Sequence, residues 1–333
     1  RAMRAAGRLR PLARHRPARA CRAARQICSP RSDAQHLHHI QAALPPAYAA
    51  SFEQFAPVWH AVLQAAEAGA AVSGEPSTIL DLASAQGEPA CSLAQRFPRA
   101  EVVATDNEAA MVAAARERGE RLALGTRFST QQVDMRQICA LAGMPPSEVG
   151  LQADLVTASL ALHMLPPAEI EACLSGLHAL LKPGGRLIAT VWEDEFALLP
   201  LGRRCLARIL GKDVDELPPL EPHSPLGLAH GRADALLKRA GFELGPHHNT
   251  IFPFSLNLGM RNSETTWMVG LMPCLGALQN IAEASGEGGS GGVFEAAKQA
   301  FIHETKDALD ASGDIIVGPM QVRVLAAVKP PAP

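Results

Sequence analysis

The chain has 333 residues, of which 47% are hydrophobic and 19% charged, a composition typical of a globular protein with a sizeable core. It has no apolar run of about 18 residues or more, so the sequence predicts no membrane-spanning helix. Its seven cysteines form no Cys-x-x-Cys pair and have no zinc-like spacing to histidine, which predicts reduced thiols and no bound metal.

The net charge of −2 hides an uneven distribution of charge along the chain. Residues 1–31 contain ten arginines and no acidic residue, which leaves 21 basic against 33 acidic residues afterwards. The basic segment 1–32 predicts an organelle transit peptide, and hence a mitochondrial or plastid protein, or else a disordered tail or translated leader of a cytoplasmic one. Because the remainder is acidic and no aromatic residues interrupt the arginines, no nucleic-acid partner is expected.

A helical segment is expected at 33–75, ahead of the first strand. Tyr48, Phe52, Phe55 and Trp59 follow helical or near-helical spacing around Pro57. One interpretation is an apolar stripe that packs on the domain. The other is a lid that closes over a bound ligand and excludes water.

The stretch from residue 77 to 192 alternates strand-like and helix-like patterns. Strands are expected at 77–82, 101–105, 126–133, 153–158 and 185–192, and helices at 88–96, 108–119, 135–142 and 166–181. Repeated crossovers of this length generate a doubly wound parallel sheet of the α/β class. Ligands of such sheets bind at the carboxyl ends of the strands.

The first strand runs into a loop of small residues that is typical of a ligand site. Asp81 lies in the apolar strand, and Ala83, Ala85 and Gly87 alternate after it. Small residues let a ligand approach the backbone, and the following helix offers free N–H groups at its start. This spacing differs from the Gly-x-Gly-x-x-Gly loop that holds a dinucleotide pyrophosphate.

Two further acidic residues end the next strands. Asp106 is placed to accept both hydroxyls of a ribose, and Asp134 to accept from an adenine amino group with Met135 beside the ring. Either residue alone is equally well explained as a helix cap or a solvated strand end. Acids at three successive strand ends favour a nucleoside site.

The remainder of the chain is expected to complete the sheet and to carry two insertions. Residues 193–230, rich in leucine and proline, are too irregular for a strand and predict a cap insertion. A helix at 232–240 and a strand at 242–254 follow. A second insertion at about 260–312 holds helices at 263–282 and 292–311, and the last strand is expected at 319–328.

Five segments resemble the class I S-adenosylmethionine-dependent methyltransferases, in particular the small-molecule group related to the ubiquinone/menaquinone methyltransferases. They are Ile79–Gly87, Val103–Asp106, Val133–Met135, Ala153–His163 and Leu181–Ile188. The resemblance implies one methyltransferase domain over 76–333, with a Rossmann-like seven-stranded sheet whose last strand is antiparallel. It also implies S-adenosyl-L-methionine as cofactor and S-adenosyl-L-homocysteine as product.

The resemblance assigns a set of donor-binding residues. They are Asp81, Ala83, Ser84, Ala85, Gly87, Asp106, Asn107, Met111, Asp134, Met135, Ser159 and Leu160. The chain departs from the family at Ala83 and Ala85, where glycine is usual. After the fourth strand, Ser159-Leu-Ala-Leu lacks the Asn/Asp-Pro-Pro-aromatic motif of enzymes that methylate nucleic-acid amino groups.

The expected reaction is in-line transfer of a methyl group to an O, S or N atom of a small, partly apolar molecule. His163 is the candidate general base, with an ordinary buried histidine as the alternative. The expected acceptor pocket consists of Tyr48, Phe52, Trp59, His163, Trp192 and Trp267. Two other functions stay open, an NAD(P)-dependent oxidoreductase and a non-catalytic methyltransferase-like binding module, and the sequence carries no signal for an oligomeric state.

Overall fold

A computed structural model describes residues 52–165, 167–193, 197–217, 232–261, 264–274, 277–278, 280–281 and 291–331. The basic segment 1–32, Tyr48 and most of the expected insertion at 193–230 beyond residue 217 lie outside these ranges. No helix in the described part of the chain is long and apolar enough to cross a membrane.

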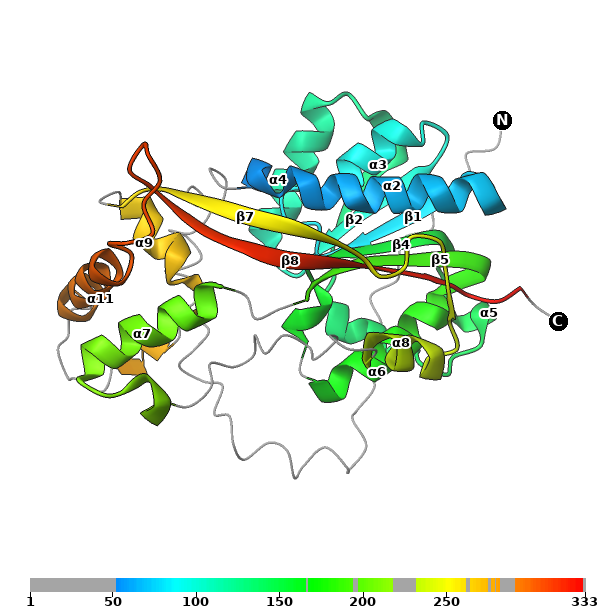
Figure 1. Cartoon of the computed structure of the whole chain (residues 1–333). Coiled ribbons are helices and arrows are strands. Elements are labelled where there is room, and N and C mark those ends of the chain that lie inside the picture. The colour runs from blue at the N-terminus through cyan, green and yellow to red at the C-terminus, as the bar shows by residue number, and fades with distance from the viewer. Residues whose placement is uncertain are drawn as a thin grey trace.

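The centre of the fold is a mixed sheet (Figure 1). Its strands are β1 Thr78–Leu82, β2 Glu101–Asp106, β3 Phe128–Gln132, β4 Ala153–Ser159, β5 Leu181–Trp192, β6 Glu243–Leu244, β7 Thr250–Met260 and β8 Asp314–Val328. The order is β3-β2-β1-β4-β5-β8-β6, and β7 also pairs with β8. Strands β1 to β5 are parallel, and β8 is antiparallel to β5. The predicted Rossmann-like sheet with an antiparallel last strand is therefore confirmed.

The expected strand at 242–254 is divided in two, so the described sheet has eight strands rather than seven. A loop separates β6 from β7, and His247 and Asn249 in it have positive φ angles of 61° and 63°. Extended pairing cannot pass through such residues. Both pieces pair with β8, which begins at Asp314 and is longer than the expected 319–328.

One face of the sheet is covered by α2 Ala56–Ser73, α3 Ala90–Arg96 and α4 Ala109–Arg121, which lie above the sheet in Figure 1. Helix α2 has Pro57 in its first turn, where the missing N–H costs nothing, and ends at Gly74 with φ 88°. Its Val62 packs with Ile79 of β1 and Ile188 of β5 in one buried cluster. The helix is preceded by the 3-10 turn η2 Glu53–Phe55.

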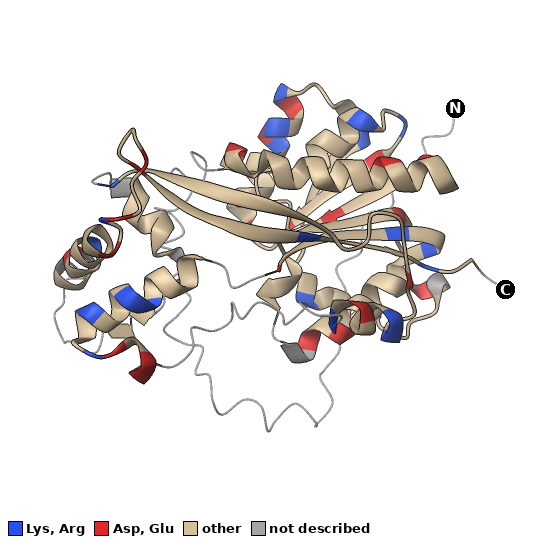
Figure 2. Ribbon diagram, viewed as in Figure 1, with Lys and Arg blue, Asp and Glu red and all other residues tan. Residues whose placement is uncertain are grey.

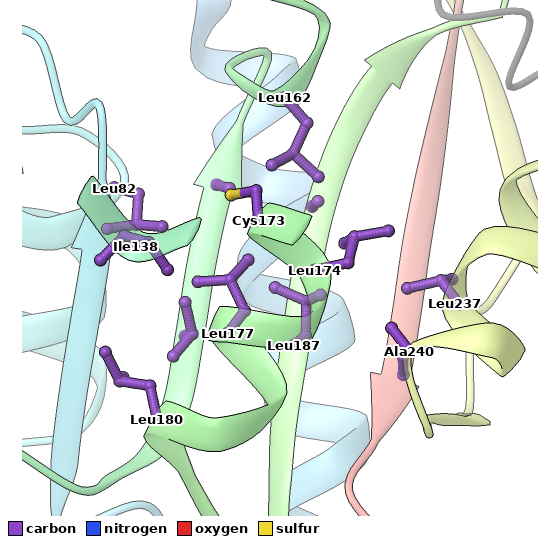
Figure 3. Close-up of a cluster of buried hydrophobic side chains, with 14 of the residues drawn as sticks. Leu82, Ile138, Leu162, Cys173, Leu174, Leu177, Leu180, Leu187, Leu237 and Ala240 are labelled. Atoms are coloured by element: carbon purple, nitrogen blue, oxygen red, sulfur yellow. The ribbon is translucent and has the colours of Figure 1, made fainter. Parts of the chain in front are cut away.

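The opposite face is covered by η4 Met135–Leu141, α6 Pro167–Leu180 and α8 Arg232–Arg239, with α5 Pro146–Val149 beside them. Leu82, Ile138, Leu177 and Leu187 belong to the buried cluster that joins these helices to the sheet (Figure 3). The segment predicted as a helix at 135–142 is a 3-10 helix that packs on α6. In Figure 2 the charged residues gather on helices and loops, and the central strands are almost uncharged.

A second group of helices lies beyond the sheet. It contains α7 Leu198–Leu210, α9 Glu264–Gly270, η7 Met272–Cys274 and α11 Gly291–Glu304. Strands β7 and β8 run together past the end of the sheet to reach these helices (Figure 1). Helix α7 lies inside the expected helical cap insertion at 193–230, and its leucines recur at helical spacing and bury one face.

Two helices of this group are shorter than expected. The described part of 263–282 contains α9 and η7 rather than one long helix, and α11 ends at Glu304 rather than at 311. After α11, the Asp310 carboxylate accepts hydrogen bonds from the amides of Ser312 and Asp314. A turn held in this way replaces the last helical turns.

Candidate donor and acceptor sites

The sheet register brings the three acidic residues to one edge. Asp81 of β1 lies opposite Ala104 of β2, and Asp106 at the end of β2 lies opposite Gln132 at the end of β3. Asp134 follows Gln132 by two residues. Because β1, β2 and β3 are parallel neighbours, all three carboxylates lie along the carboxyl edge of the sheet.

The loop Ala83–Gly87 after β1, which we call the donor loop, is wound tightly at this edge. Ala83 and Ala85 have φ angles of 53° and 46°, and Gly87 has φ 100°. These values fall in the left-handed region that glycine adopts without strain and alanine does not. The amide of Ser84 donates to the Thr105 carbonyl over 2.8 Å, which holds the turn against β2.

The carboxyl group of Asp81 is fully buried beneath this loop. Its Oδ1 accepts a hydrogen bond from the Thr157 hydroxyl over 2.5 Å, whereas its Oδ2 meets no hydrogen-bond partner of good geometry in the described chain. Burial raises the pKa of Asp81 to about 7, against the opposing effect of the Ser84 and Thr157 hydroxyls. A buried oxygen of this kind is a ready acceptor for a positively charged ligand group.

Asp106 fastens the loop to the start of α4. Its Oδ2 accepts from the Ala85 amide over 2.9 Å and its Oδ1 accepts from the Glu108 amide over 3.0 Å. Burial raises the pKa of Asp106, and these backbone hydrogen bonds partly offset the rise. Since each carboxylate oxygen can accept two hydrogen bonds, Asp106 keeps acceptor capacity for a diol beside these backbone amides.

Asp134 caps η4 and also pairs with a neighbour. Its Oδ1 accepts from the Arg136 amide over 2.9 Å, and its Oδ2 lies 2.7 Å from the Arg136 Nη2. Partial burial raises the pKa of Asp134, but hydrogen bonds from Arg136 outweigh that effect and leave the pKa below its usual value. The carboxylate therefore already has a cationic partner at the position expected to receive adenine.

The other donor residues surround these acids in different ways. Asn107 is exposed and its carbonyl accepts from Gln132, while Met111 is half-buried in the first turn of α4. Met135 is half-buried in η4 and packs on the core. The Ser84 hydroxyl turns inward, because it accepts from the Thr105 amide over 3.2 Å rather than facing the loop.

The end of β4 is held by β5. The Ser159 and Thr190 hydroxyls lie 3.1 Å apart, and the Leu160 amide donates to the Thr190 carbonyl and hydroxyl, each over 3.0 Å. Leu160 has a positive φ of 47°. The chain therefore turns sharply out of β4 and leads into η5 Leu162–Met164, which carries His163.

Aromatic side chains form a row from His163 to the start of α2. The ring centroids of His163 and Trp192 are 6.5 Å apart. Those of Trp192 and Phe254 are 5.8 Å apart, and those of Phe254 and Phe55 are 5.0 Å apart. His163 and Trp192 are both buried. We call His163, Trp192, Phe254 and Phe55 the aromatic row.

The remaining expected acceptor residues lie on either side of this row. Phe52 and Trp59 contact each other at 4.7 Å between ring centroids, next to α4. Trp267 of α9 is buried in the same apolar cluster as Trp192. The described residues of the expected pocket therefore fall into two groups, and Phe55 and Phe254 connect them.

Several residues of these sites were not predicted from the sequence. Thr157 and Thr190 interrupt apolar strands, which is a detectable sign of a polar role. Phe254 follows Pro253 in an edge strand and resembles an ordinary core residue. The ion pair of Arg118 with Glu88 joins segments 30 residues apart and has no local pattern.

Comparison with known proteins finds relatives for the part of the chain that contains this edge of the sheet. Residues 79–185 match a family model described as a methyltransferase domain. The chain is 37% identical over 111 residues to the carboxy-S-adenosyl-L-methionine synthase of Geobacter metallireducens, an alignment that covers 32% of this chain and 41% of the relative. It is 36% identical over 118 residues to the demethylmenaquinone methyltransferase of Thermus thermophilus, covering 35% and 48%.

Among solved structures, an O-methyltransferase family protein from Burkholderia thailandensis aligns with a TM-score of 0.39 and 20% identity over 55% of this chain and 50% of that one. The chain spans less than half the length of each of these two curated relatives. The matched region contains β1 to β4 and the start of β5, with the loop and the three acids described above. Residues 79–185 therefore resemble a methyltransferase domain, and they contain the loop and the acidic residues at the carboxyl edge of the sheet.

Proposed function

We propose that this protein is an S-adenosylmethionine-dependent methyltransferase that methylates an O, S or N atom of a small, partly apolar molecule. The observation that carries the proposal is the buried Asp81 carboxyl group, whose Oδ2 meets no hydrogen-bond partner of good geometry in the described chain and which is followed by left-handed turns at Ala83 and Ala85. When bound, S-adenosylmethionine supplies a methyl group on a positively charged sulfur, from which a nucleophile takes it by in-line displacement.

The residues at the sheet edge suit the parts of this donor. Asp81 and the backbone of the Ala83–Gly87 loop would hold its amino acid end, since a buried carboxylate favours a cationic group. The free acceptor positions on Asp106 would receive the two ribose hydroxyls. Asp134 would receive the adenine amino group only by sharing or releasing Arg136, while Met135 packs beside the ring.

The protein's contribution to the chemistry is alignment and the exclusion of water. Ser159 and Leu160, fixed by Thr190, would shape the wall between donor and acceptor. The aromatic row would receive a flat or apolar acceptor. An imidazole nitrogen of His163 would take the proton of a hydroxyl, thiol or amine as that atom is methylated.

Calorimetry on the 333-residue chain tests the proposal directly. We expect both S-adenosylmethionine and S-adenosylhomocysteine to bind, and Asp81→Ala to weaken both. Binding of neither compound to the unmodified chain would refute the proposal. Incubation with methyl-labelled donor and a metabolite extract, followed by mass spectrometry, would then identify the acceptor, and nucleic acid added in parallel is expected to stay unlabelled.

A role for His163 in proton transfer has its own test. We expect His163→Gln to lower the methylation rate at saturating donor and to leave donor affinity within about twofold, because the residue is assigned to the acceptor side. An equal loss of rate and of donor affinity would indicate a structural role for His163.

A second candidate, a methyltransferase-like module that binds but does not catalyse, is favoured by one observation. Alanine replaces the usual glycine at positions 83 and 85, and both residues adopt positive φ angles. Binding of the donor with no labelled product from any extract would support this alternative. An NAD(P)-dependent oxidoreductase is disfavoured by the loop spacing. If NADPH fluorescence does not change when NADPH is mixed with the protein, this function is excluded.

A further inference from the structure

The short segment Phe52–Phe55 ahead of α2 contacts both α4 and β7. On one side, the Glu53 carboxylate accepts from the Arg118 Nη1 of α4 over 2.7 Å. On the other side, the Gln54 side chain donates to the Asn257 carbonyl over 2.8 Å and accepts from the Asn257 amide over 2.7 Å. Phe55 stacks on Phe254. Four consecutive residues therefore join α4 to β7, across the carboxyl edge of the sheet.

Arg118 of α4 contacts both this segment and Glu88, the residue that follows the donor loop. Its Nε and Nη2 lie 3.1 and 2.9 Å from the Glu88 Oε1, and its guanidinium also lies 5.7 Å from the centre of the Phe52 ring. The Glu88 side chain is 4% exposed and the Arg118 side chain 16%, whereas that of Glu53 is 66% exposed. The pair with Glu88 is therefore internal, and the pair with Glu53 is external.

Two contacts of Glu88 and the close packing of Gly87 hold the loop. Its amide donates to the Ser84 carbonyl over 3.1 Å, and its Oε2 accepts from the Ser92 amide at the start of α3 over 3.1 Å. The residue before it, Gly87, packs so closely on α4 that an added Cβ would lie 3.2 Å from the Cα of Ala115. The shape of the Ser84–Glu88 turn therefore depends on how α4 and Arg118 hold it.

Charge favours Arg118 over other residue types at this position. A buried carboxylate such as Glu88 needs a cationic partner, and the planar guanidinium can contact Glu88, Glu53 and the face of Phe52 at once. Burial acts to lower the pKa of Arg118, but its two carboxylate partners outweigh that effect and raise it. A lysine would keep the charge but has one nitrogen for all three contacts.

We propose that Arg118 is a positioning residue for donor binding, which couples the Phe52–Phe55 segment to the turn Ser84–Glu88. This inference rests on the proposed function. The Glu53–Arg118–Glu88 array holds the turn in the form that presents Asp81 and the loop backbone to the donor, and it holds Phe52 beside that turn. Loss of the outer pair alone loosens the turn and weakens donor binding, with little effect on the folding of the sheet beneath.

The test compares three single-residue variants of the 333-residue chain with the unmodified chain. Glu53→Gln removes the outer pair, and Arg118→Lys keeps the charge but not the bridging geometry. Glu67→Gln is the matched control, because it removes another exposed ion pair of the α2 region, with Arg96 of α3, away from the loop. S-adenosylhomocysteine affinity is measured by calorimetry, thermal unfolding is measured without ligand, and hydrogen–deuterium exchange is followed over residues 84–92.

We expect Glu53→Gln and Arg118→Lys to weaken S-adenosylhomocysteine binding by about tenfold, the size of one charge-assisted hydrogen bond. Exchange over 84–92 should quicken in both variants without ligand, while Glu53→Gln and Glu67→Gln unfold at the temperature of the unmodified chain. If hydrogen–deuterium exchange over 84–92 is unchanged in Glu53→Gln and Arg118→Lys, the proposal is wrong, whether or not the chain binds S-adenosylhomocysteine. If the unmodified chain binds no S-adenosylhomocysteine, the proposed function fails, and the exchange result still decides whether Arg118 positions the turn.

Discussion

The hydroxyl group of Thr157 donates a 2.5 Å hydrogen bond to the Oδ1 of Asp81, while the Oδ2 of that carboxyl group meets no hydrogen-bond partner of good geometry in the described chain. The two residues lie opposite each other in the register of β1 and β4. A polar residue inside an apolar strand therefore orients the carboxyl group that we propose to hold the donor.

The raised pKa of Asp81 predicts that donor binding depends on pH. Because that pKa is about 7, half of the buried groups are protonated at neutral pH, and only the ionised form attracts a cation. Affinity for S-adenosylmethionine should therefore rise from pH 6 to pH 8, by at most about tenfold per unit. Asp81→Asn should bind more weakly and remove this part of the pH dependence, and an unchanged slope in calorimetry would contradict the assignment.

The same group predicts how stability changes with pH. The folded pKa of about 7 lies above the ordinary value of 3.8, so the folded state holds the proton more tightly than the unfolded state. The contribution of Asp81 is therefore fully present below about pH 4 and is lost as the pH rises through 7. Urea unfolding at pH 5 and pH 8 should show a smaller difference for Asp81→Asn than for the unmodified chain.

The alanines of the donor loop predict an unusual response to glycine. Ala85 has φ 46°, so Ala85→Gly should relieve backbone strain and raise the free energy of unfolding by about 1 kcal/mol. Ala83→Gly should gain less, because the methyl group of Ala83 also packs on the core. The control is Ala113→Gly on the exposed face of α4, which should lose about 1 kcal/mol. If Ala85→Gly and Ala113→Gly lower the free energy of unfolding in urea equally, the inference that the backbone of Ala85 is strained is wrong.

The pair between Asp134 and Arg136 predicts that removing the arginine improves donor binding. The Arg136 side chain is 61% exposed, so its loss should change stability little. Arg136→Ala frees Asp134 for the adenine amino group and should tighten S-adenosylhomocysteine binding by about threefold, a small change in free energy. Arg116→Ala on exposed α4 serves as the charge control. Weaker binding by Arg136→Ala alone would show that Arg136 itself contacts the donor.

The contact between α6 and η4 predicts a large cost for one added methyl group. A Cβ at Gly176 would lie 1.9 Å from the Ile138 carbonyl oxygen, so α6 must move away from η4. Gly176→Ala should lower the free energy of unfolding by about 2–3 kcal/mol. Ser175→Ala, one residue earlier on the same helix, should stay within about 0.5 kcal/mol. Similar unfolding midpoints in urea for the two variants would contradict this packing.

Local patterns in the sequence predict the parallel part of the sheet. Buried parallel strands are short apolar runs, and those ending in Leu82, Asp106 and Ser159 are separated by helical spacing, so both element types are legible without tertiary information. The antiparallel last strand follows from the family resemblance. The division between β6 and β7 was not predicted, because it depends on a loop that turns over two positive φ angles and on how both pieces meet β8.

The sequence by itself determined the order of strands and helices and the positions of Asp81, Asp106 and Asp134 at successive strand ends, because periodic burial and chain order are local properties. Only the tertiary structure decided what those residues touch. Thr157 reaches Asp81, Arg118 joins Glu88 to Glu53, and Gln54 meets Asn257 across 203 residues of sequence. Such contacts depend on the sheet register and on how helices pack over it, and no local pattern encodes them.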